Sequence, residues 1–388
     1  LNLWTVLLLG TLGACGCGSP EKSDDFEGLV DLRNGPPNIV IFALDTWRAD
    51  HMGAYGNDWV LTPVLDCFAG EAIVFEDCAS TSTWTLPAFA SMFTGLLPSE
   101  HRTIGGKRSV VPSRMVPLAE RLQAHGYTTA AIVAVDYLDK PFGLERGFAQ
   151  HRSFADWPVN GRLRKYERLV ARAFKEPPED PWMLLLHYFD AHDPYEPPDQ
   201  FDRMYYEGDP AAEPEDPAHR IDVIYSDRNR IQSEPQVRYR WLEGIRDLRY
   251  PVQQYAGGIS YVDHHLGAAL DSMRATGAMD ESIVIVVADH GEHLTEHDVY
   301  FTHRLPYSEC LQVPLMIRLP HARDGGRRIQ DPVSLVDLMP TLMDLIGLPI
   351  EDEVTGISLV PLLRGEELPD RLLFAEYGAA PDNWAKSV

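Results

Sequence analysis

The apolar residues of this chain gather in short continuous runs that alternate with longer amphipathic stretches. Runs of this kind are typical of strands buried on both faces, as in a parallel sheet. We expect such strands at residues 38–44, 128–135, 182–187, 283–288 and 314–319. We expect helices at residues 86–94, 116–125, 255–276 and 334–346, each followed directly by a glycine. The alternation predicts an α/β fold with a βαβ architecture and a largely parallel sheet.

One stretch, residues 198–250, interrupts the alternation. It is rich in Asp, Glu, Arg, Pro and Tyr and has little periodicity. A structureless loop of that length is unusual in a compact domain. We therefore interpret it as an insertion of short helices that lies over the site and shapes a substrate pocket. A plain surface excursion is the alternative.

Polar groups that suit a metal ion follow two of the expected strands. Asp45 ends the first run, and Asp289 and His290 follow residues 283–288. Open α/β sheets build their sites at the carboxyl ends of the strands, so these segments can converge. Carboxylate and imidazole ligands suit Ca²⁺, Mg²⁺, Mn²⁺ or Zn²⁺. The pattern predicts a divalent metal site.

Thr85 lies just ahead of an expected helix, with Pro87 in the first turn. The N–H groups and positive dipole end of a helix favour an oxyanion there. Metal coordination would lower the pKa of the hydroxyl and make it a nucleophile. A capping role is the alternative. Beside Asp45, Asp289 and His290, we predict that Thr85 binds the metal and attacks the substrate.

Two further segments carry candidate substrate contacts. The run HYFDAHDPY at residues 187–195 follows another expected strand and holds two imidazoles and two carboxylates. We expect His192 to contact a non-bridging oxygen of a tetrahedral anion, and Asp190 to orient it or to hold a second metal. His303 is a candidate general acid for the leaving oxygen. A second metal site of Asp190, His192 and His303 is left open.

Other charged groups near these segments have simpler interpretations. His293 and His297 are spaced as on one helix face, and the neighbouring Glu292 favours a solvated face over a metal pair. Arg48 and Asp50 suit a local ion pair.

The length and net charge of the chain limit its domain organisation and its classes of binding partner. The chain has 388 residues, 45% of them hydrophobic, and a net charge of -24. This size suits one large α/β domain or two ordinary ones. The acidic balance argues against nucleic acid or an anionic membrane surface as the main partner. It does not exclude an anionic substrate, because a bound metal can dominate the local field.

The N-terminal residues indicate export. Residues 1–14 read LNLWTVLLLGTLGA, too short to span a bilayer and similar to the apolar part of a secretory signal. Residues 12–15 match a lipobox in which Cys15 would be lipidated. We predict a signal at 1–15, a polar tether at 16–36, and a periplasmic or cell-envelope protein that contacts a membrane through its lipid anchor only. A buried helix ending in a chance cysteine is the alternative.

The two ends and the remaining cysteines allow fewer conclusions. The chain has no initial Met and stops without a terminal signal, so we expect sequence to be missing at both ends. Cys67 and Cys78 are the only nearby cysteine pair. A disulfide or two buried thiols fit them equally well.

Together the motifs resemble the sulfatase branch of the alkaline phosphatase superfamily. The matching segments are residues 37–45, 85–95, 118–120, 126–130, 145–148, 190–195, 261–263, 288–292, 313–315 and 333–341. The resemblance implies an alkaline-phosphatase-like central mixed, mostly parallel sheet sandwiched by helices, over residues 37–366. It also implies a small C-terminal α+β subdomain, of which residues 367–388 would be the truncated start.

The resemblance also assigns roles. It implies metal binding by Asp45, Asp289 and His290, a nucleophile at Thr85, and contacts to the transferred group by the two other histidines, His192 and His303.

The chain departs from the typical family pattern at several positions. Sulfatases carry Cys/Ser-x-Pro-x-Arg, whose first residue becomes formylglycine, whereas this chain reads TLPAF at residues 85–89. No formylglycine is therefore expected, and the arginine is absent. A usual second aspartate is Thr46, and His303 stands where lysine is common. The metal ligands also resemble those of phosphoglycerol and phosphoethanolamine transferases, which usually have membrane helices ahead of the catalytic domain.

We predict a metal-dependent hydrolase that cleaves a sulfate or phosphate ester through a Thr nucleophile. The substrate would be a small anionic ester, such as a sulfated or phosphorylated sugar, lipid or aryl ester. One divalent metal, Ca²⁺, Mn²⁺ or Zn²⁺, is expected. The alternatives are a transferase of the cell envelope and a decayed anion-binding protein.

Overall fold

A central sheet positions the candidate residues. The computed structural model describes residues 28–33, 35–104, 109–156, 162–179, 181–225, 239–378 and 384–387. Within them, eight strands pair in the order β5-β4-β6-β1-β7-β8-β2-β9. Their bounds are β1 (Asn38–Leu44), β2 (Ile73–Phe75), β4 (Thr128–Val133), β5 (Gln150–Ser153), β6 (Trp182–Tyr188), β7 (Ser282–Ala288), β8 (Leu315–Arg318) and β9 (Arg328–Ile329).

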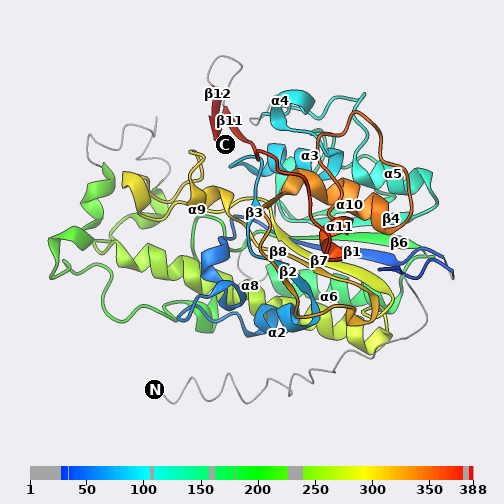
Figure 1. Ribbon diagram of the computed structural model, residues 1–388. Coiled ribbons are helices and arrows are strands. Elements are labelled where there is room, and N and C mark those ends of the chain that lie inside the picture. Colours follow the sequence, from blue (N-terminus) through cyan, green and yellow to red (C-terminus); the bar gives the residue numbers. More distant parts are fainter. Residues whose placement is uncertain are drawn as a thin grey trace.

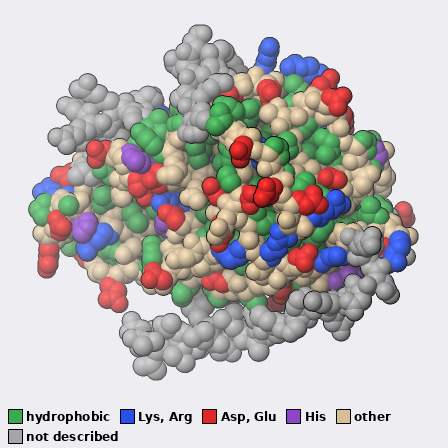
Figure 2. Space-filling model, in the orientation of Figure 1, with side chains coloured by type: hydrophobic (Ala, Val, Ile, Leu, Met, Phe, Trp, Pro, Cys, Tyr) green, Lys and Arg blue, Asp and Glu red, His purple; other side chains and the backbone are tan. Residues whose placement is uncertain are grey.

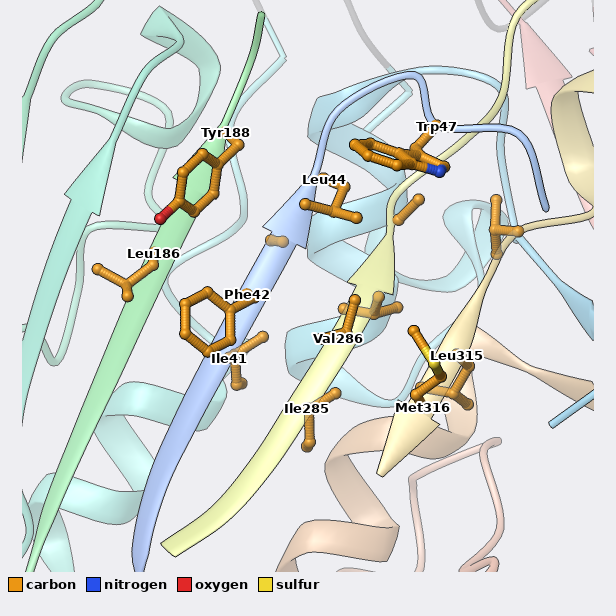
Figure 3. Close-up of a cluster of buried hydrophobic side chains, with 14 of the residues drawn as sticks. Ile41, Phe42, Leu44, Trp47, Leu186, Tyr188, Ile285, Val286, Leu315 and Met316 are labelled. Atoms are coloured by element: carbon orange, nitrogen blue, oxygen red, sulfur yellow. The ribbon is translucent and has the colours of Figure 1, made fainter. Parts of the chain in front are cut away.

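The sheet is mixed and mostly parallel, as the sequence predicted. Strands β5, β4, β6, β1 and β7 run parallel to their neighbours, whereas β8 pairs antiparallel with β7 and β2. Every residue of β1 is buried, and its bounds match the predicted run. Figure 3 shows why: side chains of β6, β1, β7 and β8, including Phe42, Val286 and Met316, lie side by side in one apolar cluster.

Helices cover both faces of the sheet (Figure 1), with α2, α6 and α8 on one side and α3, α5 and α10 on the other. The helix bounds are α2 (Pro63–Glu71), α3 (Thr85–Thr94), α4 (Pro98–His101), α5 (Leu118–Ala124), α6 (Arg162–Lys175), α8 (Arg249–Thr276), α9 (Ser308–Leu311), α10 (Leu338–Leu345) and α11 (Val360–Leu363). Among the described residues, no helix is long and apolar enough to cross a membrane.

The predicted helices begin at other positions than their apolar spacing indicated, by one residue for α3, two for α5, four for α10 and six for α8. Helix α8 starts at Arg249 rather than at residue 255, and the carboxylate of Asp247, just ahead of the N-cap Leu248, accepts the Arg249 N–H at 2.9 Å. The segment predicted as a helix from residue 334 opens with a 3-10 turn at Leu335–Asp337 before α10.

The described part of residues 198–250 contains short 3-10 helices. They are η4 (Asp199–Phe201), η5 (Pro217–His219), η6 (Ile221–Tyr225) and η7 (Arg240–Leu242); residues 226–238 lie outside the described residues. At its end, the Tyr239 hydroxyl donates to the Tyr300 carbonyl at 2.7 Å. The Trp241 ring packs edge-on against Tyr195 and Phe301, with centroids 5.2 and 5.9 Å apart. This end therefore contacts the segments that precede His303 and follow His192.

The C-terminal part supports the loop ahead of α3. Strands β11 (Ala375–Gly378) and β12 (Trp384–Ser387) form a two-stranded antiparallel sheet. The backbone of Glu376 bonds to Thr81 and Ser82 at 2.8 and 3.0 Å, and its carboxylate accepts the Ser99 N–H at 2.5 Å. A second pair, β3 (Cys78–Ala79) and β10 (Val333–Ser334), is parallel.

Some predictions have different outcomes. Cys67 and Cys78 form no disulfide, so the buried-thiol alternative holds for Cys78, which is buried in β3. The predicted signal, Cys15 and most of the tether lie outside the described residues, so export and lipidation stay predictions.

On the face in Figure 2, Asp and Glu side chains are interspersed with Lys and Arg.

Candidate active site

The four predicted metal-binding residues converge at the carboxyl edge of the sheet. Asp45 follows β1, and Asp289 and His290 follow β7, the strand paired in parallel with β1 through Leu44 and Ala288. Thr85 is the first residue of α3, with an exposed fraction of 3%. The other three side chains are fully buried.

The distances place these side chains around one point. The Thr85 hydroxyl lies 3.4 Å from Asp45 Oδ2 and 3.3 Å from His290 Nε2. His290 Nε2 lies 3.6 Å from Asp289 Oδ2. One ligand atom each from Asp45, Asp289 and His290 falls within 4.8 Å of the others. A single ion can therefore contact all three residues and the hydroxyl.

The hydrogen bonds around this point leave ligand atoms directed inward. Asp289 Oδ1 accepts the N–H groups of His290 and Thr46 at 2.8 and 3.3 Å. His290 Nδ1 donates to the Gly291 carbonyl at 2.9 Å, which leaves Nε2 with its lone pair. Asp45 Oδ1 and Asp289 Oδ2 have no hydrogen-bond partner among the described residues, although both are buried. Such oxygens are costly unless a cation satisfies them, so the donor set fits a divalent metal.

The electrostatics favour the same interpretation. Burial and the charge of Asp45 raise the pKa of Asp289 well above its usual range. Burial also acts to raise the pKa of Asp45, but the hydrogen bond from His187 and the nearby imidazoles lower it overall. Burial lowers the pKa of His290 to about 4. At neutral pH, His290 is therefore a neutral imidazole, the form that binds metals.

Two backbone features fix the turns that carry these ligands. Thr46 adopts a φ of 53°, rare for a β-branched residue, and its carbonyl accepts the Tyr255 hydroxyl at 2.7 Å. That conformation directs the Thr46 N–H at Asp289. A Cβ on Gly291 would lie 2.0 Å from the Glu309 carbonyl oxygen, so only glycine fits directly after His290.

The two histidines predicted to touch substrate lie beside the buried group and are partly exposed. The His303 ring stacks on His290, with centroids 4.5 Å apart and planes 12° apart. His192 meets His303 edge-on at 5.3 Å. His303 Nδ1 donates to the Thr83 carbonyl at 3.1 Å, and His192 Nδ1 to the Asp193 carbonyl at 2.7 Å. In both rings Nδ1 is the atom that bonds to a backbone carbonyl.

Comparison with known proteins identifies the family. The sequence profile described as Sulfatase matches residues 37–348. The chain belongs to the sulfatase family. It is 25% identical over 398 residues to an arylsulfatase of Clostridium perfringens, covering 84% of this chain and 78% of that protein. It is 24% identical over 464 residues to an N-acetylglucosamine-6-O-sulfatase of Bacteroides thetaiotaomicron, covering 100% and 78%.

The fold agrees with this membership. A phosphonate monoester hydrolase of Agrobacterium radiobacter superposes with a TM-score of 0.73 and 22% identity, covering 88% of this chain and 80% of that chain. The predicted alkaline-phosphatase-like α/β fold is confirmed. Sulfatases and phosphonate monoester hydrolases are ester hydrolases, so this sulfatase-family chain is an enzyme of the predicted hydrolase type.

No second three-ligand group is found among the described residues. Asp190 is buried, but within the part of the chain that the structure describes, the one group of three His, Cys, Asp or Glu residues suited to an ion is Asp45, Asp289 and His290. Asp190, His192 and His303 therefore do not form an equivalent group.

One buried residue received no role from the sequence. His187, the sixth residue of β6, places its Nε2 3.3 Å from Asp45 Oδ2. Its signal is visible in the sequence: it is an imidazole directly after the apolar run WMLLL in a strand that is buried throughout. A buried imidazole in such a strand needs polar surroundings, and this one lies beside a predicted metal ligand.

The neighbouring charged segment differs in part from its prediction. The Arg48–Asp50 ion pair forms at 2.6 Å, and Arg48 also bonds Glu296 at 2.7 Å. The expectation of a solvated helix face is wrong for Glu292 and His293, which are fully buried. His293 exchanges backbone hydrogen bonds with Thr302 instead of lying on a helix, and this pairing buries it.

Proposed function

We propose that this sulfatase-family protein hydrolyses a sulfate or phosphate ester of a small molecule, with Thr85 as the nucleophile. One divalent cation would be held by Asp45, Thr85, Asp289 and His290. The observation that carries the proposal is the position of the Thr85 hydroxyl, within 3.4 Å of both Asp45 and His290.

The cation, when bound, would lower the pKa of the hydroxyl and withdraw charge from the substrate. Thr85 Oγ1 attacks the sulfur or phosphorus atom in line, and the bond to the bridging ester oxygen breaks. The first-turn N–H groups of α3, a ten-residue helix, favour the anion at this position. Water then attacks the Thr85 ester, which releases sulfate or phosphate and restores the hydroxyl.

The partly exposed histidines would handle the remaining charges. His303, stacked on His290, would in its protonated form give a proton to the leaving oxygen. His192 donates to a non-bridging oxygen of the transferred group. Electrostatic contributions of this kind are worth about 10²–10³ in rate for each group.

The leaving group would carry a ring, as in a sugar or aryl ester. Trp84, directly before the nucleophile, is half-buried. The centroid of its ring lies 6.1 Å from the ring centroids of both His303 and Tyr137. Aromatic side chains at this place offer a flat surface to a ring. The arylsulfatase and N-acetylglucosamine-6-O-sulfatase relatives support this substrate class.

An unmodified threonine favours phosphate over sulfate in this proposal. Its ester has no second hydroxyl on the same carbon to expel the group, so water must attack the central atom again. Assays with an aryl sulfate, a phosphate monoester and a phosphodiester side by side would rank them, and the phosphate monoester is expected to turn over fastest.

The nucleophile is tested by replacing the hydroxyl. Thr85→Ala should reduce turnover by at least about 10³-fold while the protein stays folded, and Thr85→Ser should retain part of it. Thr276→Ala, at the exposed end of α8, is the matched control and should be fully active. Near-normal turnover by Thr85→Ala would refute the assignment.

The same assays separate the two alternatives. Turnover that requires both a lipid donor and an acceptor would identify a transferase. A folded, metal-loaded protein that binds sulfate or phosphate but cleaves no ester would identify an anion-binding protein. Phe89 stands where the family pattern has arginine, and this difference is the reason to test for an anion-binding protein.

A further inference from the structure

The imidazole of His187 is buried against the proposed metal site, yet it takes no part in the reaction proposed above. It lies at the carboxyl end of β6, whose parallel pairing with β1 places it opposite Ala43, two residues before Asp45. The side chain is fully buried. Because a buried imidazole is costly without polar partners, its two contacts decide its role.

The contacts define which nitrogen carries the proton. His187 Nδ1 accepts the Ala134 N–H at 3.4 Å, so in the neutral ring the hydrogen is on Nε2. Nε2 lies 3.3 Å from Asp45 Oδ2. The protonated nitrogen therefore lies within ion-pair distance of one particular oxygen of a predicted metal ligand, outside hydrogen-bond geometry.

The other side of the ring is supported by Phe89. Its ring meets His187 edge-on, with centroids 5.5 Å apart and planes 68° apart. Phe89 is four residues after Thr85 and so lies on the same face of α3. It also stands where the Cys/Ser-x-Pro-x-Arg pattern has arginine. In this chain, an aromatic residue at that position packs against an imidazole that comes from β6.

The two oxygens of Asp45 have different surroundings. Oδ2 faces His187 Nε2 and the Thr85 hydroxyl. Oδ1 lies 4.0 Å from His290 Nε2 and has no hydrogen-bond partner among the described residues. A carboxylate held through one oxygen keeps the other in a fixed direction.

We propose that His187 is a positioning residue for metal binding. The positive edge of its ring at Nε2, 3.3 Å from Oδ2 of Asp45, attracts that oxygen, so that Oδ1 stays directed at the point shared with Asp289 and His290. The inference rests on the proposed cation site and adds the residue that orients one of its ligands.

The test measures Mn²⁺ affinity by titration calorimetry on folded, metal-free protein. His187→Phe keeps a ring against Phe89 and removes the N–H, and it should weaken Mn²⁺ binding about 10–100-fold. His187→Gln restores an N–H at similar reach and should recover most of the affinity. His101→Phe is the matched control, because His101 is equally buried but bonds to Ser91 and Thr103. It should bind Mn²⁺ as the wild type does.

Two results would overturn the inference: unchanged affinity in His187→Phe, or equal losses in the Phe and Gln variants. If His187→Phe does not fold, ¹⁵N NMR of the wild type decides, since an Nδ1–H tautomer of His187 contradicts the proposal and an Nε2–H tautomer supports it. Failure of the wild type to bind Mn²⁺ or another divalent cation would instead refute the metal site itself.

Discussion

Two acidic regions begin shortly after β1, the first at Asp45 and the second at Asp50. The charges of their carboxylates are balanced in different ways. Asp45 and Asp289 are fully buried, and the ion-pair partners within 4 Å that the described residues offer them are the imidazoles of His187 and His290. Asp50 and Glu296 share the guanidinium of Arg48 instead. Among the described residues, no arginine or lysine pairs with the carboxylates of the first region, whereas Arg48 pairs with those of the second.

This difference explains why one region suits a metal and the other does not. Buried carboxylates need compensating charge, and a neutral imidazole supplies none. A divalent ion at Asp45 and Asp289 would supply that charge. Arg48 already supplies it to Asp50 and Glu296. Both regions consist of acids and histidines, so the arginine is the feature that separates them.

The largest expected effect comes from removing a carboxylate in the first region. Asp289→Asn should weaken Mn²⁺ binding by more than about 100-fold, beyond what loss of an orienting residue causes. Asp50→Asn makes the same change in the second region and should leave Mn²⁺ affinity unchanged. Titration calorimetry on both variants compares them, and equal losses would contradict the distinction between the regions.

The next largest effect is a loss of stability, and we expect it from a change in the second region rather than the first. The Arg48 side chain is only 6% exposed, and Arg48→Gln removes the guanidinium from Glu296 and leaves Asp50 with the His51 imidazole at 2.7 Å. The free energy of unfolding should fall by about 2–3 kcal/mol, less than for a fully buried pair because both acids are partly exposed. Urea denaturation measures it. Arg328→Gln, which breaks a more exposed pair with Glu76, is the control and should cost far less.

A pH effect should be confined to the first region. Burial and the charge of Asp45 raise the pKa of Asp289, so protons compete with a cation for this carboxylate. Metal affinity should therefore rise with pH. Calorimetry in buffers of different ionisation enthalpy should show that protons are released when Mn²⁺ binds. An affinity independent of pH, with no proton released, would argue against this competition.

The smallest effect is expected at His297, a histidine seven positions after His290. Its side chain is 44% exposed, stacks on Tyr307, and lies 3.3 Å from Glu309. His297→Ala should change the free energy of unfolding by no more than about 0.5 kcal/mol and leave metal affinity unaltered. A marked loss of Mn²⁺ affinity would show that this exposed histidine contributes to the site.

The sequence predicted the parts of the fold and site that depend on local pattern. The run at residues 38–44 is a strand with those bounds. Six of its seven side chains are apolar, and the polar one, Asn38, is buried at the start of the strand. Asp45, Asp289 and His290 could be placed together because parallel strands end at one edge. Thr85 followed from its place at a helix start.

What the sequence could not predict depends on partners distant in the chain. The contact of His187 with Asp45 joins two strands 142 positions apart in numbering, and the Arg48–Glu296 bond joins still more distant segments. His293 was misread because its spacing from His297 has meaning only on a helix. The bridge to Thr302 that buries it is a tertiary pairing.

The central claim is that Asp45, Thr85, Asp289 and His290 share one cation. Anomalous diffraction from crystals of the Mn²⁺-loaded protein tests it directly. We predict a single strong peak in contact with the Thr85 hydroxyl and with one atom from each of the other three residues. A peak beside Asp50 and Glu296, or none at the carboxyl ends of β1 and β7, would contradict the account.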